Sequence, residues 1–236
     1  MTAEQTVAVD LPAPALRSVL GKVCFLAKTG NDKEWLNAAY LHRSGTDLEA
    51  VASDGCAIFA ARHPYQGPDF GGLTLPSALA HVLLEKLGTT QASDRVTISQ
   101  DEEAVVASIG KDWRRSALRL LEDRKGEEMV AVIPKTNFCE AAVPRGALLL
   151  TLEQLKVDAR VEFDMDSLMI GGIVLQADVA GDEPVSPLLY DRFRLHDIVS
   201  RFDAPRVTLG FRRSTDPVVI SARGEIAALA AMWFKD

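Results

Sequence analysis

The chain has 236 residues, which is enough for one large domain or for two of about 100 to 120 residues each. Hydrophobic residues make up 47% and charged residues 25%, a composition typical of a globular protein with a substantial core and not of a disordered one. The net charge of −7 argues against a protein that coats nucleic acid with its whole surface, because such proteins need a broad cationic face.

The sequence also predicts where the protein works. No apolar run reaches the roughly 18 residues that a membrane span requires, and the N-terminus carries Glu4 and Asp10 in place of an apolar signal core. Cys24, Cys56 and Cys139 lack the paired spacing of disulfide frameworks and zinc sites. We therefore expect a cytoplasmic protein with reduced cysteines, no membrane partner and no cofactor.

The first elements in chain order are a strand, a helix and a meander of strands. Apolar residues at helical spacing predict a helix over 13–28. The pair Asp54-Gly55 interrupts a later alternating run and indicates a hairpin. Alternating apolar residues predict the strands of this region, over 6–11, 35–44 and 47–62.

The same order then begins again. A second helix is predicted from Ser77 to Leu87, where Gly88 ends it. Three further strands follow, over 95–99, 104–109 and 113–121. The charged, aperiodic stretch after them predicts a linker, so we divide the chain into a first domain over 1–125, a linker over 126–136 and a second domain over 137–236.

The second domain repeats the layout of the first. Helices are predicted over 144–156 and over 191–203, where Asp191 is a good N-cap residue, and Gly171-Gly172 indicates a bend or turn. Strands are predicted over 137–144, 159–164, 168–179, 206–211, 217–222 and 227–234. About four copies of a helix followed by strands, two per domain, predict an α+β fold in which antiparallel sheets back two helices in each domain.

Four stretches, in order along the chain, resemble segments of the DNA sliding clamps, the family of the bacterial DNA polymerase III beta subunit. They are WLNAAYLHRSGTDLEAVASDGCAIFAAR (35–62), LTLPSALAHVLLEKL (73–87), FRLHDIVSRFDAPRVTLGFRRSTDPVVISA (193–222) and ALAAMWFKD (228–236). Their order and spacing are similar to those of the family's second and third domains. The chain departs from the pattern at the turn Asp54-Gly55-Cys56-Ala57, where the family usually has His-Arg after the glycine.

The resemblance implies a ring-forming DNA clamp fold and a processivity factor that is not an enzyme. Such a protein encircles double-stranded DNA without reading its sequence, and it binds a DNA polymerase and a clamp loader through their linear peptide motifs. Six similar domains close a ring in the known clamps, so two domains per chain imply a head-to-tail homotrimer joined through exposed edge strands.

Basic side chains on the helices would supply the attraction to phosphates. The helix over 13–28 carries no acidic residue and that over 144–156 carries only Glu153, whereas the other two helices are balanced and the whole chain is acidic. The predicted DNA-facing residues are Arg17, Lys22, Lys28, Lys86, Arg145, Lys156, Arg194 and Arg201. The alternative is that these cations are merely the solvated face of amphipathic helices.

The second implied surface is a hydrophobic groove for peptide motifs, which the family has beside its interdomain linker and C-terminal strand. Apolar side chains suit an aliphatic or aromatic anchor, and methionine adapts to varied ligands. Carried over by position, the groove residues are Leu36, Ser53, Gly55, Cys56, Ile58, Pro134, Thr215, Pro217, Ala230 and Met232. Packing in the core is the alternative for each of them.

An enzyme and a clamp-like scaffold are the alternative functions for this sequence. An enzyme lacks support because the sequence has no phosphate-binding glycine-rich loop, no His-Glu-x-x-His and no nucleophile elbow, and its four histidines are scattered. A clamp-like scaffold or decoy that binds clamp-binding peptides without encircling DNA is the stronger alternative. Sequence alone does not separate that scaffold from a sliding clamp.

Overall fold

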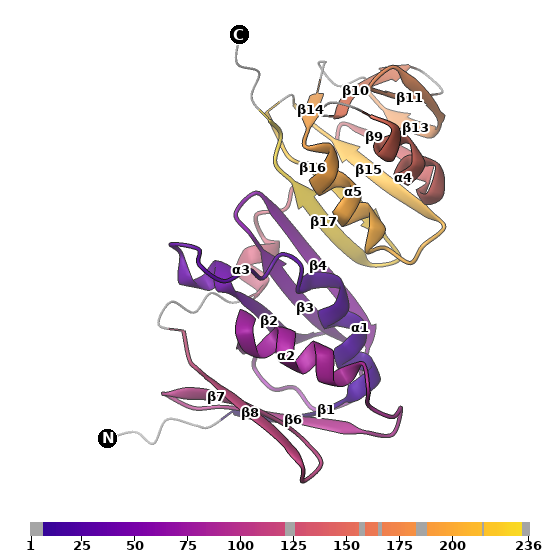
Figure 1. Cartoon of the computed structure of the whole chain (residues 1–236). Coiled ribbons are helices and arrows are strands. Elements are labelled where there is room, and N and C mark those ends of the chain that lie inside the picture. Colours follow the sequence, from indigo (N-terminus) through magenta and orange to yellow (C-terminus); the bar gives the residue numbers. More distant parts are fainter. Residues whose placement is uncertain are drawn as a thin grey trace. The chain divides into compact units, whose positions relative to one another are not determined.

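The computed structural model describes residues 7–120, 126–155, 159–164, 167–182, 188–213 and 215–232. The chain divides into two compact units, Met1–Val130 and Ala131–Asp236, and the division falls inside the predicted linker. Figure 1 shows two helices beside antiparallel sheets in each unit, as the repeated layout of the sequence predicted. The α+β class is therefore confirmed.

Unit 1 holds helices α1 (Ala13–Val23) and α2 (Ser77–Leu87) against two sheets. One sheet has the strand order β1-β6-β7-β8, and the other contains β4-β3-β2-β5, with every neighbouring pair antiparallel. The strands are β1 (Val7–Pro12), β2 (Ala38–Ser44), β3 (Asp47–Ser53), β4 (Ala57–Pro64), β5 (Leu73–Pro76), β6 (Arg95–Gln100), β7 (Ala104–Ile109) and β8 (Trp113–Leu118).

Unit 2 repeats this construction with helices α4 (Arg145–Gln154) and α5 (Arg192–Ser200). Its sheets run β12-β11-β10-β14 and β13-β9-β15-β16-β17, again antiparallel throughout. The strands are β9 (Cys139–Pro144), β10 (Ala159–Asp164), β11 (Ser167–Ile170), β12 (Ile173–Gln176), β13 (Asp178–Gly181), β14 (Leu188–Tyr190), β15 (Arg206–Phe211), β16 (Val218–Ala222) and β17 (Glu225–Leu229).

Three of the four long helices follow a strand that ends in proline. Pro12, Pro76 and Pro144 occupy the N-cap positions of α1, α2 and α4 with extended backbone. Proline suits this place because the first amides of a helix have no partner inside the helix, so the missing N–H removes nothing. The exception is α5, where the Asp191 carboxylate accepts hydrogen bonds from the amides of Phe193 (2.9 Å) and Arg194 (3.1 Å), as predicted for an N-cap.

The structure corrects several predicted elements. The helix predicted over 13–28 ends at Val23, and residues 24–26 form a turn in which the Leu26 amide donates to the Val23 carbonyl (3.0 Å). The strand predicted over 35–44 starts only at Ala38. Residues 34–37 form a 3₁₀ turn in which the Asn37 side chain pairs with the backbone N–H (2.9 Å) and carbonyl (3.0 Å) of Asn31.

The third correction concerns residues 168–179, predicted as strand with a bend or turn at Gly171-Gly172. They form parts of three strands, β11, β12 and β13, and a tight turn separates the first two. Gly171 and Gly172 make that turn with φ values of 58° and 85°, a conformation that favours glycine. Residues 126–130, inside the predicted linker, form the short helix α3 (Gly126–Val130), which packs on β3 with Met129 buried.

Candidate nucleic-acid and peptide interfaces

Two cationic side chains at the α1–α2 pair have no ion-pair partner among the described residues, and α2 also exposes the acidic Glu85. Leu16, Val19 and Leu20 of α1 are fully buried, which leaves Arg17 exposed on the opposite side. Lys28 is also exposed, although it lies after the end of α1 and not on the helix as predicted. Neither cationic group makes a hydrogen bond or ion pair with any residue in the described part of the chain.

The other predicted cations of unit 1 are less accessible. Lys22 is half-buried in the last turn of α1 and has an interaction partner. Lys86 is half-buried in the last turn of α2 and lines a polar cavity of about 530 Å³ between that turn and the sheet of β1, β6 and β7. Arg17 and Lys28 are therefore the cations of this pair that are best placed to meet a phosphate.

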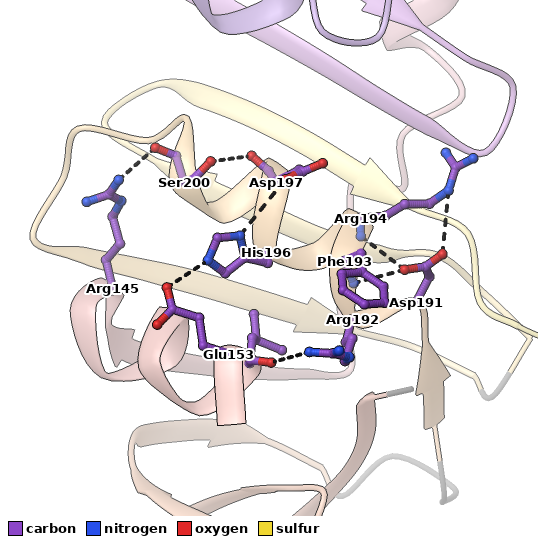
Figure 2. Close-up of polar contacts among 10 residues, drawn as sticks. Arg145, Glu153, Asp191, Arg192, Phe193, Arg194, His196, Asp197 and Ser200 are labelled. Carbon is purple, nitrogen blue, oxygen red and sulfur yellow. Dashed lines mark hydrogen bonds and ion pairs between the residues drawn. The ribbon is translucent and has the colours of Figure 1, made fainter. Parts of the chain in front are cut away.

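In unit 2 the first residue of each helix binds the end of the other helix. Arg145 begins α4 and donates from Nε to the Val199 carbonyl (3.1 Å) and from a terminal nitrogen to the Ser200 carbonyl (2.6 Å), at the end of α5. Arg192 begins α5 and donates to the Leu152 carbonyl in the last turn of α4 (3.2 Å). Figure 2 shows both contacts. Because helix C-termini carry unpaired carbonyls and partial negative charge, these arginines act as reciprocal caps.

The remaining charges of the α4–α5 pair face one another. Arg194 lies 3.7 Å from the Asp191 carboxylate, and His196 lies between Glu153 (3.3 Å) and Asp197 (3.9 Å) (Figure 2). Arg201, just after α5, is half-buried and has an interaction partner. Lys156 lies outside the described residues, so the predicted role of this residue stays a prediction.

Two large apolar side chains are exposed on the α4–α5 pair, and sequence reasoning did not single them out. Leu150 of α4 is 60% exposed and Phe193 of α5 is 63% exposed. The Arg192 guanidinium lies over the Phe193 ring, 3.9 Å from its centroid, which is a cation–π geometry. The outward surface of this pair is thus partly apolar.

The structure brings together the five predicted groove residues of unit 1 at the hairpin between β3 and β4. Ser53 Oγ donates to the Ala57 carbonyl (2.7 Å) and accepts from the Gly55 amide (3.1 Å), which fixes the turn. Ser53 and Ile58 are partners in the ladder, and Leu36 lies in van der Waals range of Gly55. Gly55 has φ 88°, as the predicted hairpin needs, and Cys56 is exposed at the tip.

Four of the five predicted groove residues of unit 2 surround the pair of strands β16 and β17. Pro217 and Ala230 flank the paired residues Val218 and Leu229. Met232 is 37% exposed, and its amide donates to the Leu189 carbonyl (2.9 Å), which holds the chain after β17 beside β14. The exposed Thr215 precedes β16. The fifth, Pro134, is half-buried just before β9.

The strands with a single partner in the described part of the chain include β1 and β8 in unit 1 and β12 and β14 in unit 2. β8 pairs with β7 alone, and β12 pairs with β11 alone. Each of these edges exposes a large apolar side chain: Leu118 is 80% exposed and Val174 is 65% exposed. The sequence predicted that edge strands would join copies but did not indicate which strands they are, since edge position depends on the topology of the sheet.

The described residues contain no cluster of histidine, cysteine and carboxylate side chains that could hold a metal ion. Among the same residues, no helix is both long and apolar enough to cross a membrane.

Solved structures with the same fold are bacterial sliding clamps. The DNA polymerase III beta subunit of Thermotoga maritima superimposes with a TM-score of 0.83 at 17% identity, over 100% of this chain and 68% of that one. The beta subunit of Pseudomonas aeruginosa gives 0.84 at 14% identity, over 99% and 68%. The DNA polymerase sliding clamp of Bacillus subtilis gives 0.81 at 13% identity, over 98% and 66%.

The chain therefore spans about two thirds of the length of these clamps. No family model and no curated protein matches the sequence. The resemblance predicted from four short stretches is confirmed as a resemblance of fold, which extends over both units.

Proposed function

We propose that this chain is a DNA sliding clamp, which encircles duplex DNA and tethers a DNA polymerase and a clamp loader. The observation that carries the proposal is the fold: nearly every residue of the chain superimposes on a bacterial clamp with a TM-score above 0.8. Arg17 and Lys28 support it, because both are exposed and neither has a charge partner among the described residues. Weak, sequence-independent attraction to phosphates holds DNA and still permits sliding.

The ring would consist of three copies arranged head to tail. The chain has two units and about two thirds of the length of the clamps that it resembles, so three copies would supply six similar units. The edges of β8 and β12 support this arrangement, because each strand has one partner among the described strands and an exposed apolar residue. In a head-to-tail ring the β8 edge of one copy would meet the β12 edge of the next, and both edges would be covered.

The peptide groove would comprise the residues around the β3–β4 hairpin and those around β16 and β17. Exposed Cys56 and Met232 would contact a bound peptide, while Leu36 and Ile58, which are buried, would support the groove from beneath. A polymerase or loader would insert an aliphatic or aromatic anchor there. A protein with these two surfaces acts by binding, does no chemistry and works in the cytoplasm, where DNA is replicated.

The test is topological retention. The protein is incubated with its loader and nicked circular DNA, and the complex is isolated by gel filtration. We expect it to remain on circular DNA at salt concentrations that break phosphate contacts, and to be lost when a restriction enzyme linearises the circle. Loss from circular and linear DNA at the same rate would overturn the proposal.

A clamp-like scaffold that binds peptides without enclosing DNA is the second candidate. The observation that favours it is the α4–α5 pair, whose arginines bind helix ends and carboxylates within the unit. A scaffold would bind polymerase peptides normally and would show no retention on circular DNA.

A further inference from the structure

The two helix pairs differ in what their positive charges bind. On the α1–α2 pair, Arg17 and Lys28 project into solvent with no partner among the described residues. On the α4–α5 pair, Arg145 and Arg192 donate to carbonyl oxygens of the partner helix, and Arg194 faces Asp191. The same fold unit, used twice, thus carries two kinds of helix surface.

The caps of the α4–α5 pair are not available for exchange with DNA. If Arg145 turned toward a phosphate, the carbonyls of Val199 and Ser200 would each lose a charge-assisted hydrogen bond. The free energy lost with these two bonds would offset the free energy gained from the phosphate contact. Arg192 is held twice, by the Leu152 carbonyl and by the Phe193 ring. Both guanidinium groups are therefore fixed parts of the helix pair.

The carboxylates of this pair lower its attraction for phosphates further. Asp191 lies beside Arg194, and Glu153 and Asp197 lie on either side of His196 (Figure 2). Glu153 and Asp197 have side chains that are 59% and 65% exposed, so they would repel a phosphate at the same surface. Leu150 and Phe193 are exposed on the same two helices and bind no anion.

We infer that the phosphate contacts of the proposed clamp come from the α1–α2 pair, with Arg17 and Lys28 as the contacting residues, and that the α4–α5 pair forms a neutral wall. This inference rests on the proposed function. It implies that attractive and neutral surfaces alternate around the ring, one of each per copy. DNA would then be attracted at three places in a trimer and not at six.

A matched pair of single substitutions tests the inference. Arg17→Gln and Arg194→Gln each remove one positive charge from the solvent side of a helix, one in each unit. Affinity for a short blunt-ended duplex, onto which a ring can thread, is measured by fluorescence anisotropy over a range of NaCl concentrations. Binding of a phosphate by a cation makes the logarithm of affinity fall with the logarithm of salt, with a slope of about 0.9 for each phosphate that is neutralised on duplex DNA.

We expect Arg17→Gln to weaken binding and to reduce the slope of log affinity against log salt by about 0.9 for each phosphate that is no longer neutralised. We expect the same of Lys28→Gln. Arg17→Lys, which keeps the charge, should restore the wild-type slope. Arg194→Gln should leave both affinity and slope unchanged. Thermal unfolding of each variant shows whether any weakening comes from misfolding.

An equal or larger decrease of slope in Arg194→Gln would overturn the inference, and so would an unchanged slope in Arg17→Gln and Lys28→Gln. These outcomes leave the proposed function standing as long as the wild-type protein stays on circular DNA. Failure of the wild-type protein to bind or retain DNA would overturn both.

Discussion

At the scale of single residues, the structure buries Glu49, an ionised group that the sequence did not mark. Glu49 of β3 has a side chain only 3% exposed, and it lies between its cross-strand neighbours on β2 and β4. His42 Nε2 lies 3.0 Å from one carboxylate oxygen, and Arg62 Nε donates to the other at 2.7 Å. A glutamate in an alternating strand is typical of a solvent face, so its burial follows from the register of three strands and not from local sequence.

Replacing Glu49 with glutamine should strongly destabilise unit 1. The change leaves the Arg62 guanidinium without its carboxylate. Removing one partner of a buried ion pair lowers the free energy of unfolding by about 3–5 kcal/mol. Because half-exposed Arg62 can turn toward water, we expect a value near the lower end. Urea unfolding at pH 7 measures the free energy of unfolding. The control is Asp10→Asn, which removes the carboxylate paired with Arg95 in an ion pair that is far more exposed than that of Glu49.

The effect of Glu49→Gln should depend on pH. Burial alone would raise the pKa of the Glu49 carboxyl, but hydrogen bonds and charge from His42 and Arg62 outweigh it and hold the pKa below its ordinary value of 4.5. A carboxyl with a lowered pKa in the folded state stabilises the fold above pH 4.5 and loses that contribution as the pH falls through its folded value. The difference between wild type and Glu49→Gln should therefore be constant near neutrality and shrink below pH 4.5; a constant difference down to about pH 3 would contradict this account.

Met232 is the residue at which the proposed groove is most directly tested. It is 37% exposed, so Met232→Asp should change the stability of unit 2 by less than about 0.5 kcal/mol. A peptide that covers the aspartate would bury an unpaired charge, and we expect its affinity to fall about tenfold or more. Fluorescence polarisation with a labelled clamp-binding peptide measures this fall, and Leu150→Asp on α4 is the control that should bind normally. Unchanged binding by Met232→Asp would show that the groove lies elsewhere.

At the scale of elements, α4 and α5 stabilise each other through their ends. Each helix begins with an arginine that binds carbonyls at the end of its partner, so the two helices hold each other in an antiparallel arrangement. The corresponding first residues in unit 1 are Ala13 and Ser77, and there Ser77 Oγ donates to the Ala27 carbonyl (2.5 Å), beyond the end of α1. The same need is met in unit 1 by a hydroxyl in place of a guanidinium.

Arg145→Met should therefore destabilise unit 2 although the residue is half-buried. The substitution keeps the apolar stem and removes two hydrogen bonds to carbonyls of α5, at an expected cost of about 1–3 kcal/mol. Chemical denaturation followed by circular dichroism measures it. Arg194→Met is the control, because an ion pair as exposed and long as that of Arg194 with Asp191 contributes less than about 1 kcal/mol. If both variants lost the same free energy of unfolding, the hydrogen bonds of Arg145 to α5 would contribute no more than the surface ion pair of Arg194.

Most elements could be predicted because their sequence patterns are local. The helix over 77–87 and the turns at Asp54-Gly55 and Gly171-Gly172 depend on neighbouring residues, and the structure has them where the sequence places them. The start of β2 differs because the pairing of Asn37 with Asn31 overrides the periodic pattern, and α1 ends before its apolar pattern does, in a turn closed by the Leu26 amide and the Val23 carbonyl. The candidate surfaces were harder to predict from sequence. The sequence identifies Arg145 as a cation on a helix, but only three-dimensional packing shows that its side chain binds carbonyls of α5.

At the scale of the whole molecule, the repeated unit of two helices and two sheets carries the functional proposal. The sequence predicted the repeat from the order of its elements, with little identity between the copies. The edge strands β8 and β12 could not be foreseen in this way, because consecutive strands along the chain do not reveal which one lies at the border of a sheet. Exposure of Leu118 and Val174 becomes visible only in the folded units.

Charges placed on these edges should open the proposed ring. Leu118→Glu and Val174→Glu each introduce a carboxylate at an exposed position, so neither should lower the thermal stability of the separate chain by much. We expect light scattering to give three times the 25.6 kDa chain mass for the wild type and the mass of one chain at low concentration for each variant. Leu150→Glu should leave the trimer intact. A wild-type protein that is monomeric over a broad concentration range would contradict the ring.

The hairpin tip between β3 and β4 offers a natural handle for spectroscopy. Cys56 is exposed there, whereas Cys24 and Cys139 are buried, and burial raises the pKa of the Cys24 thiol to about 12. Because thiol reagents attack the thiolate of an accessible cysteine, a maleimide dye at neutral pH should modify Cys56 selectively in the native chain. A fluorophore at this position would lie within the proposed peptide groove. The protein could then report the arrival of a partner without the introduction or removal of a single cysteine.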